Sequence, residues 1–154
     1  MSLALQRILL TTDFSSSARH AQQYAVRLAE SFGATLHALH VVSEEAFVPS
    51  PEVQHRWLEA EIERARKQLQ VEVGGIQIGG RPVVEVTLSG DPVHEIVKYA
   101  AEHEIDVIVL GTHGRTGMSH LLIGSVAEKV VRLATCPVLT VHPTDHPFVM
   151  AAPP

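Results

Sequence analysis

The sequence predicts a single α/β domain with an open, twisted, five-stranded parallel sheet and helices on both of its faces. The length of 154 residues is that of one ordinary domain. Apolar residues make up 45% of the chain and charged residues 19%, which suits a packed core and not a disordered chain. Short apolar runs alternate five times with segments of helical periodicity. Such alternation is typical of parallel strands joined by right-handed crossovers.

The N-terminal part predicts a strand, a helix and a second strand. Residues 8–10 form a short, continuous apolar run, as in a strand that is buried on both faces. The serines at 15–17 offer N-cap hydroxyls for a helix, and Gly33 ends that helix as a C′ glycine would. Residues 36–42 predict the second strand. Steps of three and four give the helix one apolar face: Ala18, Ala21, Ala25, Leu28 and Phe32.

The middle of the chain predicts a loop, a long helix and a third strand. Residues 43–51 are polar and interrupted by prolines, which indicates the loop. The helix runs from Glu52, and glycines at 74, 75, 79 and 80 break the chain before a strand at residues 83–88. The helix carries one apolar stripe: Leu58, Ile62, Ala65 and Leu69.

The third helix opens on Asp91 as N-cap and Pro92 at the first helical position, where the missing N–H of proline is harmless. Residues 106–110 then predict a fourth buried strand. The buried face of the helix between them is Val93, Ile96, Val97 and Ala100.

The C-terminal part predicts a fourth helix and a fifth strand. Ser125 and Glu128 match a capping box at the start of the helix. Residues 136–141 predict the strand, so we expect one domain over residues 1–142 and a proline-rich tail over 143–154. The apolar face of the helix is predicted to be Val126, Val130 and Leu133.

Composition excludes several classes of function. A net charge of −5 argues against a nucleic-acid partner, because a broad basic surface is missing. The single cysteine, Cys136, excludes an internal disulfide and any multi-cysteine metal cluster. No run approaches the roughly 18–20 apolar residues of a membrane helix, and the N-terminus does not resemble a signal peptide. We therefore expect a soluble, cytoplasmic protein with no membrane partner.

The stretch GTHGRTGMSHLLIGSV at 111–126 carries the chemistry of the chain. Gly111 and Gly114 follow a buried strand, and Gly124 and Ser125 precede a helix whose N-terminus presents unpaired N–H groups. This arrangement favours a phosphate site, in which Arg115 is the one formal positive charge. The stretch is neither a P-loop nor a G-x-G-x-x-G loop. The alternative is that the glycines serve turn geometry alone.

The spacing Gly111-x2-Gly114-x9-Gly124-Ser125 is similar to the ATP-binding signature of the universal stress protein family. The resemblance extends over residues 5–142. It includes an opening ILLTTDFS, a second strand ending in HVV, an S-G-D-P stretch, a DVIVLGTHGRTG block and a closing CPVLTV, in the family's order. Thr11 departs from the pattern, because many nucleotide-binding members have proline there.

The resemblance implies a Rossmann-like fold of the adenine nucleotide alpha-hydrolase type, with ATP or another adenine nucleotide at the carboxyl edge of the sheet. Thr12 and Asp13 match the ribose end of that site, where a carboxylate accepts from vicinal hydroxyls. Val41 matches the position whose backbone reads adenine. Plainer roles for Asp13 and Val41 are a helix N-cap and a core strand residue. The triphosphate positions are matched by Gly111, Gly114, Arg115, Gly124, Ser125 and Val126.

The family also implies two partners for the chain. A divalent cation, Mg²⁺, is expected to bridge the phosphates of the nucleotide. A second copy of the chain is expected to pair through the fifth strand, Val138–Val141, which is an apolar sheet edge and so invites pairing.

Ten histidines suggest a metal site, but their spacing argues against one. His37 and His40 lie three apart on a predicted strand, so they point to opposite faces and cannot chelate together. The remaining histidines fall on helix surfaces, in the tail and around the glycine stretch. His113 and His120 flank that stretch, either as solvated loop residues or as phosphate contacts.

Three functions remain open at this point. The first is an ATP-binding stress-response protein in which nucleotide occupancy sets conformation or partner. The second is a slow ATPase or a nucleotide-dependent transferase, although no catalytic base or nucleophile–base pair stands out. The third is a nucleotide-free dimeric interaction module, for which the complete set of glycines would be unnecessary.

Overall fold

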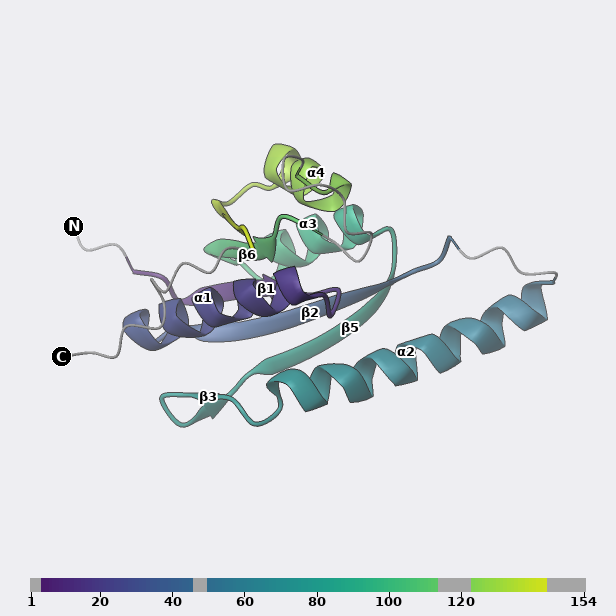
Figure 1. Ribbon diagram of the computed structural model, residues 1–154, viewed down its shortest axis with the longest axis horizontal. Helices are drawn as coiled ribbons and strands as arrows, with labels where there is room; N and C mark the ends of the chain where they lie inside the picture. Colours follow the sequence, from purple (N-terminus) through teal and green to yellow (C-terminus); the bar gives the residue numbers. More distant parts are fainter. Residues whose placement is uncertain (1–3, 46–49, 114–122, 144–154) are drawn as a thin grey trace.

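Strands and helices alternate along the chain in the computed structural model, which describes residues 4–45, 50–113 and 123–143 (Figure 1). In chain order the elements are β1 (Arg7–Thr11), α1 (Ser16–Phe32), β2 (Thr35–Ser43), α2 (Pro51–Val73), β3 (Gln77–Ile78), β4 (Arg81–Pro82), β5 (Val84–Gly90), α3 (Pro92–Glu102), β6 (Val107–Gly111), α4 (Ser125–Leu133) and β7 (Val138–Val141).

The main sheet has five parallel strands, as the sequence predicts, and their order is β5-β2-β1-β6-β7. Ile8 at the centre lies opposite Leu36 of β2 on one side and Val107 of β6 on the other. The chain builds outward from β1 to β5 and then returns to the other side of β1. Strand order therefore reverses between β1 and β6, and open α/β sheets bind ligands at such a switch point, beside the carboxyl ends of the strands.

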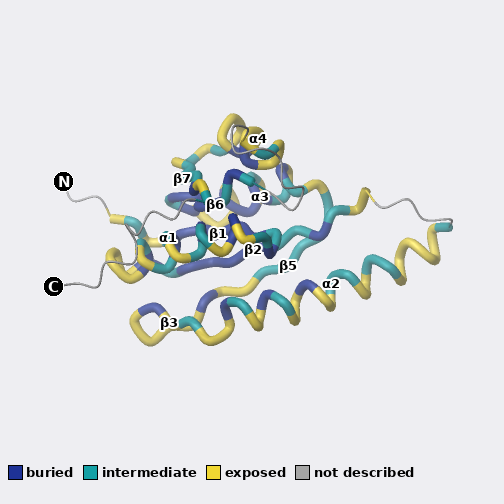
Figure 2. Tube along the Cα trace, viewed as in Figure 1, coloured by how far each residue is buried: buried dark blue, intermediate teal, exposed yellow. Residues whose placement is uncertain are grey.

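Helices cover both faces of this sheet. In Figure 1, α3 and α4 lie above the strands and α2 lies below them. The alanines Ala21, Ala25 and Ala29 are fully buried, so α1 approaches the sheet closely and shares a core with Leu69 and Val73 of α2. The core of the opposite face is formed by α3 and α4. Figure 2 shows the buried residues concentrated on the central strands.

The predicted caps of α1 and α3 are confirmed. The Ser15 hydroxyl accepts from the N–H of Ala18 at 3.2 Å, and Gly33 ends α1 with a φ of 63°. Helix α2 begins at Pro51, one residue before the prediction, because Ser50 caps it. The Asp91 carboxylate accepts from the N–H of His94 at 2.8 Å.

The capping box predicted for α4 is wrong. The N-cap is Gly124, which offers no side chain, and Ser125 is the first helical residue. Glu128 pairs with Arg132 at 2.8 Å and does not reach back to the helix start. A tertiary bond fixes the start of this helix, because the Gly124 N–H donates to the Thr112 carbonyl at 2.5 Å.

Several predicted core residues lie at the surface. Ala127 and Val130 form the buried face of α4, whereas Val126 and Leu133 are 37% and 60% exposed. Phe32, at the last turn of α1, is 42% exposed. Two of the glycines before the third strand also do more than interrupt the chain, because Gly79 and Gly80 form the turn of an antiparallel β3–β4 hairpin.

His37 and His40 point to opposite sides of β2, as predicted. His37 contacts α3 through Tyr99, and His40 packs on Phe14. Among the described residues, no group of three or more His, Cys, Asp or Glu side chains could hold a metal ion. Cys136 is a free, half-buried thiol, and burial raises its pKa. No helix in the described part of the chain is long and apolar enough to cross a membrane.

A histidine–tyrosine cluster lies on the α3 side of the sheet. His37 Nδ1 lies 2.7 Å from the Tyr99 hydroxyl, and the Tyr99 ring stacks on His103 with centroids 3.8 Å apart. Burial lowers the pKa of His37, and the nearby charges of His103 and Arg7 lower it further. The folded protein therefore holds His37 in its neutral form.

We expect this histidine to make the protein sensitive to acid. Below an ordinary histidine pKa of about 6.5, His37 takes up its proton more readily in the unfolded chain, so the free energy of unfolding falls with pH. Urea unfolding at about pH 7 and pH 5 should show a smaller loss of stability in His37→Gln than in the wild type. His94→Gln, at an exposed site, is the control and should lose as much as the wild type. An equal loss in all three proteins would contradict this assignment.

Candidate functional site

A pocket of about 450 Å³ opens where the carboxyl ends of β1, β2 and β6 meet. It lies at the switch point of the sheet, and its volume is that of an ordinary small-molecule site. Its lining comes from β1, β2, β6, the turns that follow β1 and β6, and the starts of α1, α3 and α4: Thr11, Thr12, Asp13, Ala18, Leu39, His40, Val41, Ser43, Pro92, Ile96, Leu110, Gly111, Thr112, His113, Gly124, Ser125, Val126 and Ala127.

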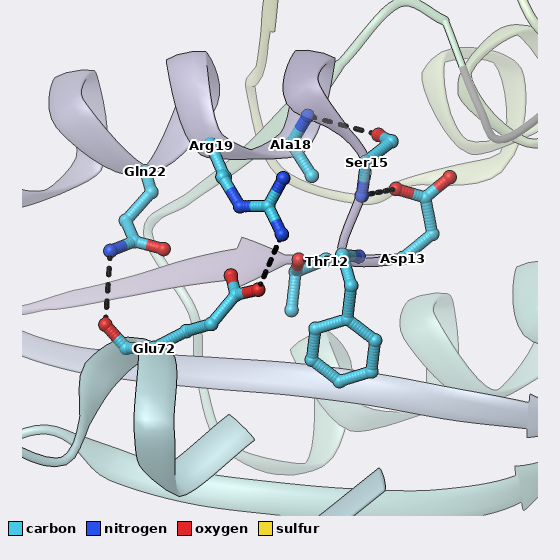
Figure 3. A network of polar contacts seen from close by, with 8 residues as sticks. Thr12, Asp13, Ser15, Ala18, Arg19, Gln22 and Glu72 are labelled. Carbon is cyan, nitrogen blue, oxygen red and sulfur yellow. Dashed lines mark hydrogen bonds and ion pairs between the residues drawn. The ribbon is translucent and has the colours of Figure 1, made fainter. Parts of the chain in front are cut away.

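The turn between β1 and α1 fixes the Asp13 carboxylate at one side of the pocket. Asp13 Oδ1 accepts from the N–H of Ser15 at 3.0 Å, and the Thr12 hydroxyl accepts from the N–H of Phe14 at 3.0 Å. Figure 3 shows Asp13, Ser15 and the first turn of α1 together. One turn further along, Arg19 pairs with Glu72 of α2 at 3.0 Å, and Gln22 donates to the Glu72 carbonyl. The turn thus leads into α1, and α1 is held against α2 by these two contacts.

The end of β2 forms a second wall of the pocket. Val41 is half-buried and packs on the core beneath α3, while the neighbouring His40 faces the β1–α1 turn. Together with Leu39, Pro92 and Ile96, Val41 gives this part of the pocket an apolar lining. Such a surface suits a flat, apolar ligand group.

Gly111, at the end of β6, lines the pocket but also lies against α1. A Cβ at this position would overlap the Ser17 hydroxyl and would lie 2.8 Å from the backbone carbonyl of Ser17. The Ser17 hydroxyl in turn accepts from the N–H of His113 at 3.3 Å. Close packing of α1 on β6 therefore explains why glycine stands at 111, a role beside the phosphate site and the turn geometry that the sequence analysis considered.

The residues that follow Gly111 join β6 to β7. Thr112 is fully buried, and its N–H donates to the Val141 carbonyl at 3.1 Å. Its hydroxyl lies 2.9 Å from His113 Nδ1 and 3.2 Å from His142 Nδ1. This bonding places the half-buried His113 on the pocket lining.

The first turn of α4 closes the pocket opposite the sheet edge. Gly124, Ser125, Val126 and Ala127 all line it, and among the described residues no side chain caps this helix. Gly124 has φ −59° and ψ 152°, a conformation open to any residue, so backbone geometry does not require glycine there. A glycine leaves the backbone open to close approach at this point of the lining.

The predicted site residues on the described part of the chain meet in this pocket: Thr12, Asp13, Val41, Gly111, Gly124, Ser125 and Val126. Gly114, Arg115 and His120 lie outside the described residues. His40 and Thr112 are pocket residues that the sequence analysis missed. His40 directly precedes Val41 at a strand end, and aligned carboxyl ends of parallel strands were the signal that could have found it.

Charge in the pocket is sparse. Among its described lining residues, Asp13 is the one side chain with a formal charge at neutral pH. Any attraction for an anion on this part of the lining therefore comes from uncharged donors, such as backbone N–H groups and the Ser125 hydroxyl, and from the positive end of the α4 dipole.

An open parallel sheet with a pocket at its switch point, bounded by a carboxylate and by an uncapped helix N-terminus, defines a class of α/β ligand-binding proteins. The sequence model of the universal stress protein family matches residues 4–142, so the chain belongs to that family.

Individual proteins agree with this assignment. The universal stress protein MJ0531 of Methanocaldococcus jannaschii is 36% identical over 143 residues, which cover 88% of this chain and 81% of the relative. The solved structure of MJ0577 from the same organism superposes with a TM-score of 0.80 at 28% identity and covers 94% of this chain and 100% of that one. A universal stress protein solved in complex with cAMP gives a TM-score of 0.60 at 26% identity over 92% of this chain and 100% of that one.

Proposed function

We propose that this pocket binds ATP, or another adenine nucleotide, and that the protein is a cytoplasmic stress-response regulator whose conformation or partner depends on nucleotide occupancy. The observation that carries the proposal is the uncapped N-terminus of α4, which lines the same pocket as the Asp13 carboxylate. The helix N-terminus would thus bind the phosphates of the nucleotide, and the carboxylate would bind its ribose.

The phosphate end is supported by a contrast among the helices. Side chains of Ser15, Ser50 and Asp91 cap α1, α2 and α3, whereas the N-cap of α4 is Gly124, which has no side chain. A helix N-terminus carries roughly half a positive charge and several unpaired N–H groups. A phosphate group satisfies both features at once.

The nucleoside end is supported by the opposite side of the pocket. Asp13 is an acceptor for the two vicinal hydroxyls of a ribose, and the bond from Ser15 fixes its carboxylate. The apolar wall that contains Val41 offers a flat surface and backbone groups to a base. The cAMP complex of the related universal stress protein supports an adenine nucleotide as the ligand class.

Mg²⁺ fits this site as a cation carried by the nucleotide. Mg²⁺ commonly keeps several waters and binds through substrate phosphates and one or two protein oxygens. The Ser125 hydroxyl, at the first residue of α4, would offer an oxygen ligand on the phosphate side of the lining. The cation would neutralise phosphate charge there.

Isothermal titration calorimetry with Mg-ATP tests the proposal. We expect one nucleotide per chain and weaker binding when Mg²⁺ is removed. Asp13→Ala removes the ribose acceptor and should lower the affinity roughly tenfold, which is the contribution of one hydrogen bond to a charged group. Asp91→Ala, which removes a carboxylate that caps α3, is the matched control and should bind normally. Absence of binding by the wild type at about 1 mM ligand would contradict the proposal.

The fifth strand supports a homodimer. Strand β7 (Val138–Val141) is an edge of the described sheet, and apolar edges pair readily. Helix α4, which leads into it, exposes Val131 and Leu133 by 49% and 60%.

Light scattering should report a dimer at tens of micromolar. Leu133→Lys should weaken this dimer, whereas Val71→Lys, at an exposed site on α2, should leave it intact. A wild-type monomer at that concentration would contradict the dimer. The proposed cytoplasmic location is a separate point, which cell fractionation tests.

A further inference from the structure

His40 joins the ends of two neighbouring strands beside the pocket. Its Nδ1 lies 2.7 Å from the backbone carbonyl oxygen of Thr12, and because that oxygen can only accept, Nδ1 must carry the proton. The Thr12 N–H donates to the Leu39 carbonyl at 2.9 Å. Both backbone polar groups of Thr12 are therefore tied to β2, although Thr12 itself follows β1.

The same imidazole also holds the residue on the far side of Asp13. The Phe14 ring stacks on His40 with centroids 4.4 Å apart and an angle of 26° between the planes. Phe14 has a φ of 66°, and a bulky residue adopts this left-handed conformation only where its surroundings enforce it. The ring contact and the bond from the Phe14 N–H to the Thr12 hydroxyl supply that constraint.

Asp13 lies between these two anchored residues. The direction of its side chain follows from the backbone angles of the turn, which are held by His40 on both sides of Asp13. The carboxylate then accepts from the Ser15 N–H at 3.0 Å (Figure 3). Three contacts thus orient one carboxylate at the edge of the pocket.

We propose that His40 is a positioning residue for nucleotide recognition: it holds the Thr12–Phe14 turn so that Asp13 accepts from the ribose hydroxyls, and it thereby sets the preference for ribose over deoxyribose. The inference rests on the proposed function and adds a residue and a specificity to it. His40 acts through Asp13 and makes no contact with the sugar. The bond to Thr12 is retained when the imidazole is protonated, because Nδ1 donates in both forms.

Substitutions at His40 separate the hydrogen bond from the ring. His40→Asn keeps a donor at the δ position, whereas His40→Leu has nearly the same shape as asparagine and no donor. His40→Phe keeps the aromatic stack on Phe14 but cannot donate to Thr12. Circular dichroism and thermal unfolding establish that each variant is folded, and His40→Phe keeps the test decisive if His40→Leu does not fold.

The affinities of each protein for ATP, 2′-deoxy-ATP, 3′-deoxy-ATP and GTP provide the test. We expect the wild type to prefer ATP over the two deoxy analogues roughly tenfold, as for one hydrogen bond to a charged group. His40→Leu and His40→Phe should reduce this preference to about twofold, whereas His40→Asn should keep most of it. In an Asp13→Ala background, His40→Leu should change the preference no further, because the two residues act as one unit.

Three other results would overturn the inference, each for a different reason. Full ribose preference in folded His40→Leu or His40→Phe contradicts the inference and leaves the proposed function intact. A change in the ATP-to-GTP preference instead would assign His40 a direct contact with the base. Absence of ATP binding by the wild type removes the proposed function and the inference together.

The ring of His40 also offers a readout that needs no nucleotide. Nitrogen NMR of the nucleotide-free protein should show a proton on Nδ1, as the bond to the Thr12 carbonyl requires. A neutral ring protonated at Nε2 alone would contradict the inference before any ligand is added.

Discussion

Gly124→Asp is expected to abolish nucleotide binding while leaving the protein at least as stable as the wild type. Aspartate is a favoured N-cap residue, and the backbone angles at Gly124 suit any side chain. The new carboxylate would accept from N–H groups in the first turn of α4 and add a few tenths of a kcal/mol to the stability of the helix. It would also place a negative charge where we propose that the phosphates bind.

The expected loss of affinity is large because like charges brought together in a pocket cost several kcal/mol, and about 2.7 kcal/mol already corresponds to a hundredfold. Gly124→Asn is the matched control, because it caps the helix equally well and carries no charge. We expect Gly124→Asn to bind ATP more weakly than the wild type and far more tightly than Gly124→Asp. Calorimetry with Mg-ATP measures both, and unchanged affinity in Gly124→Asp would show that the phosphates lie elsewhere.

Gly111→Ala is expected to have the largest effect on folding stability. Its Cβ would lie 2.8 Å from the backbone carbonyl of Ser17, and this backbone cannot give way unless α1 shifts on the sheet. Overpacking of this kind costs about 1–3 kcal/mol. In a chain of this length each kcal/mol lowers the melting temperature by about 2–4 °C.

Two variants make this prediction specific. Gly75→Ala should be close to neutral, because a Cβ at position 75 meets nothing within 4 Å. Ser17→Ala should not rescue Gly111→Ala, because the backbone carbonyl of residue 17 remains in place. Thermal unfolding of the single and double variants checks both statements. Wild-type stability of Gly111→Ala would mean that α1 has room to move, and the glycine would then need another explanation.

The sheet could be predicted because its signals are local. Apolar runs such as residues 8–10 and 106–110 are too short and too continuous for amphipathic helices. Ser15, Gly33 and Asp91 signal helix ends through their own side-chain chemistry or backbone freedom, without help from distant parts of the chain. The bounds of the five strands of the main sheet then followed to within a few residues, whereas the order of the strands in the sheet was not predicted.

The errors occurred where a tertiary contact decides the local structure. Ser125 and Glu128 fit the capping-box pattern, but the bond from the Gly124 N–H to the Thr112 carbonyl starts α4 one residue earlier. The same spacing of apolar residues in α4 permits two adjacent faces, and packing on the sheet selects Ala127 and Val130. Periodicity alone does not distinguish these two faces.

Which residues line the pocket could be predicted more readily than what each residue does there. Asp13, Val41 and Ser125 come together because the carboxyl ends of parallel strands meet at one edge of the sheet. The contact between Gly111 and Ser17 and the contacts of His40 depend on segments that are distant in the sequence. No spacing rule within one segment reveals them.

The central claim is that the first turn of α4 and the β1–α1 turn bind the two ends of one adenine nucleotide. Titration of the nitrogen-labelled protein with Mg-ATP, followed by the backbone amide signals in NMR, tests it most directly. We expect the largest shifts at Ser125, Val126 and Ala127, with further shifts at Asp13 and Val41. Shifts confined to another surface, such as the groove between α2 and β5 that Arg66 and Thr87 line, would contradict nucleotide binding at this pocket, and so would the absence of any shift.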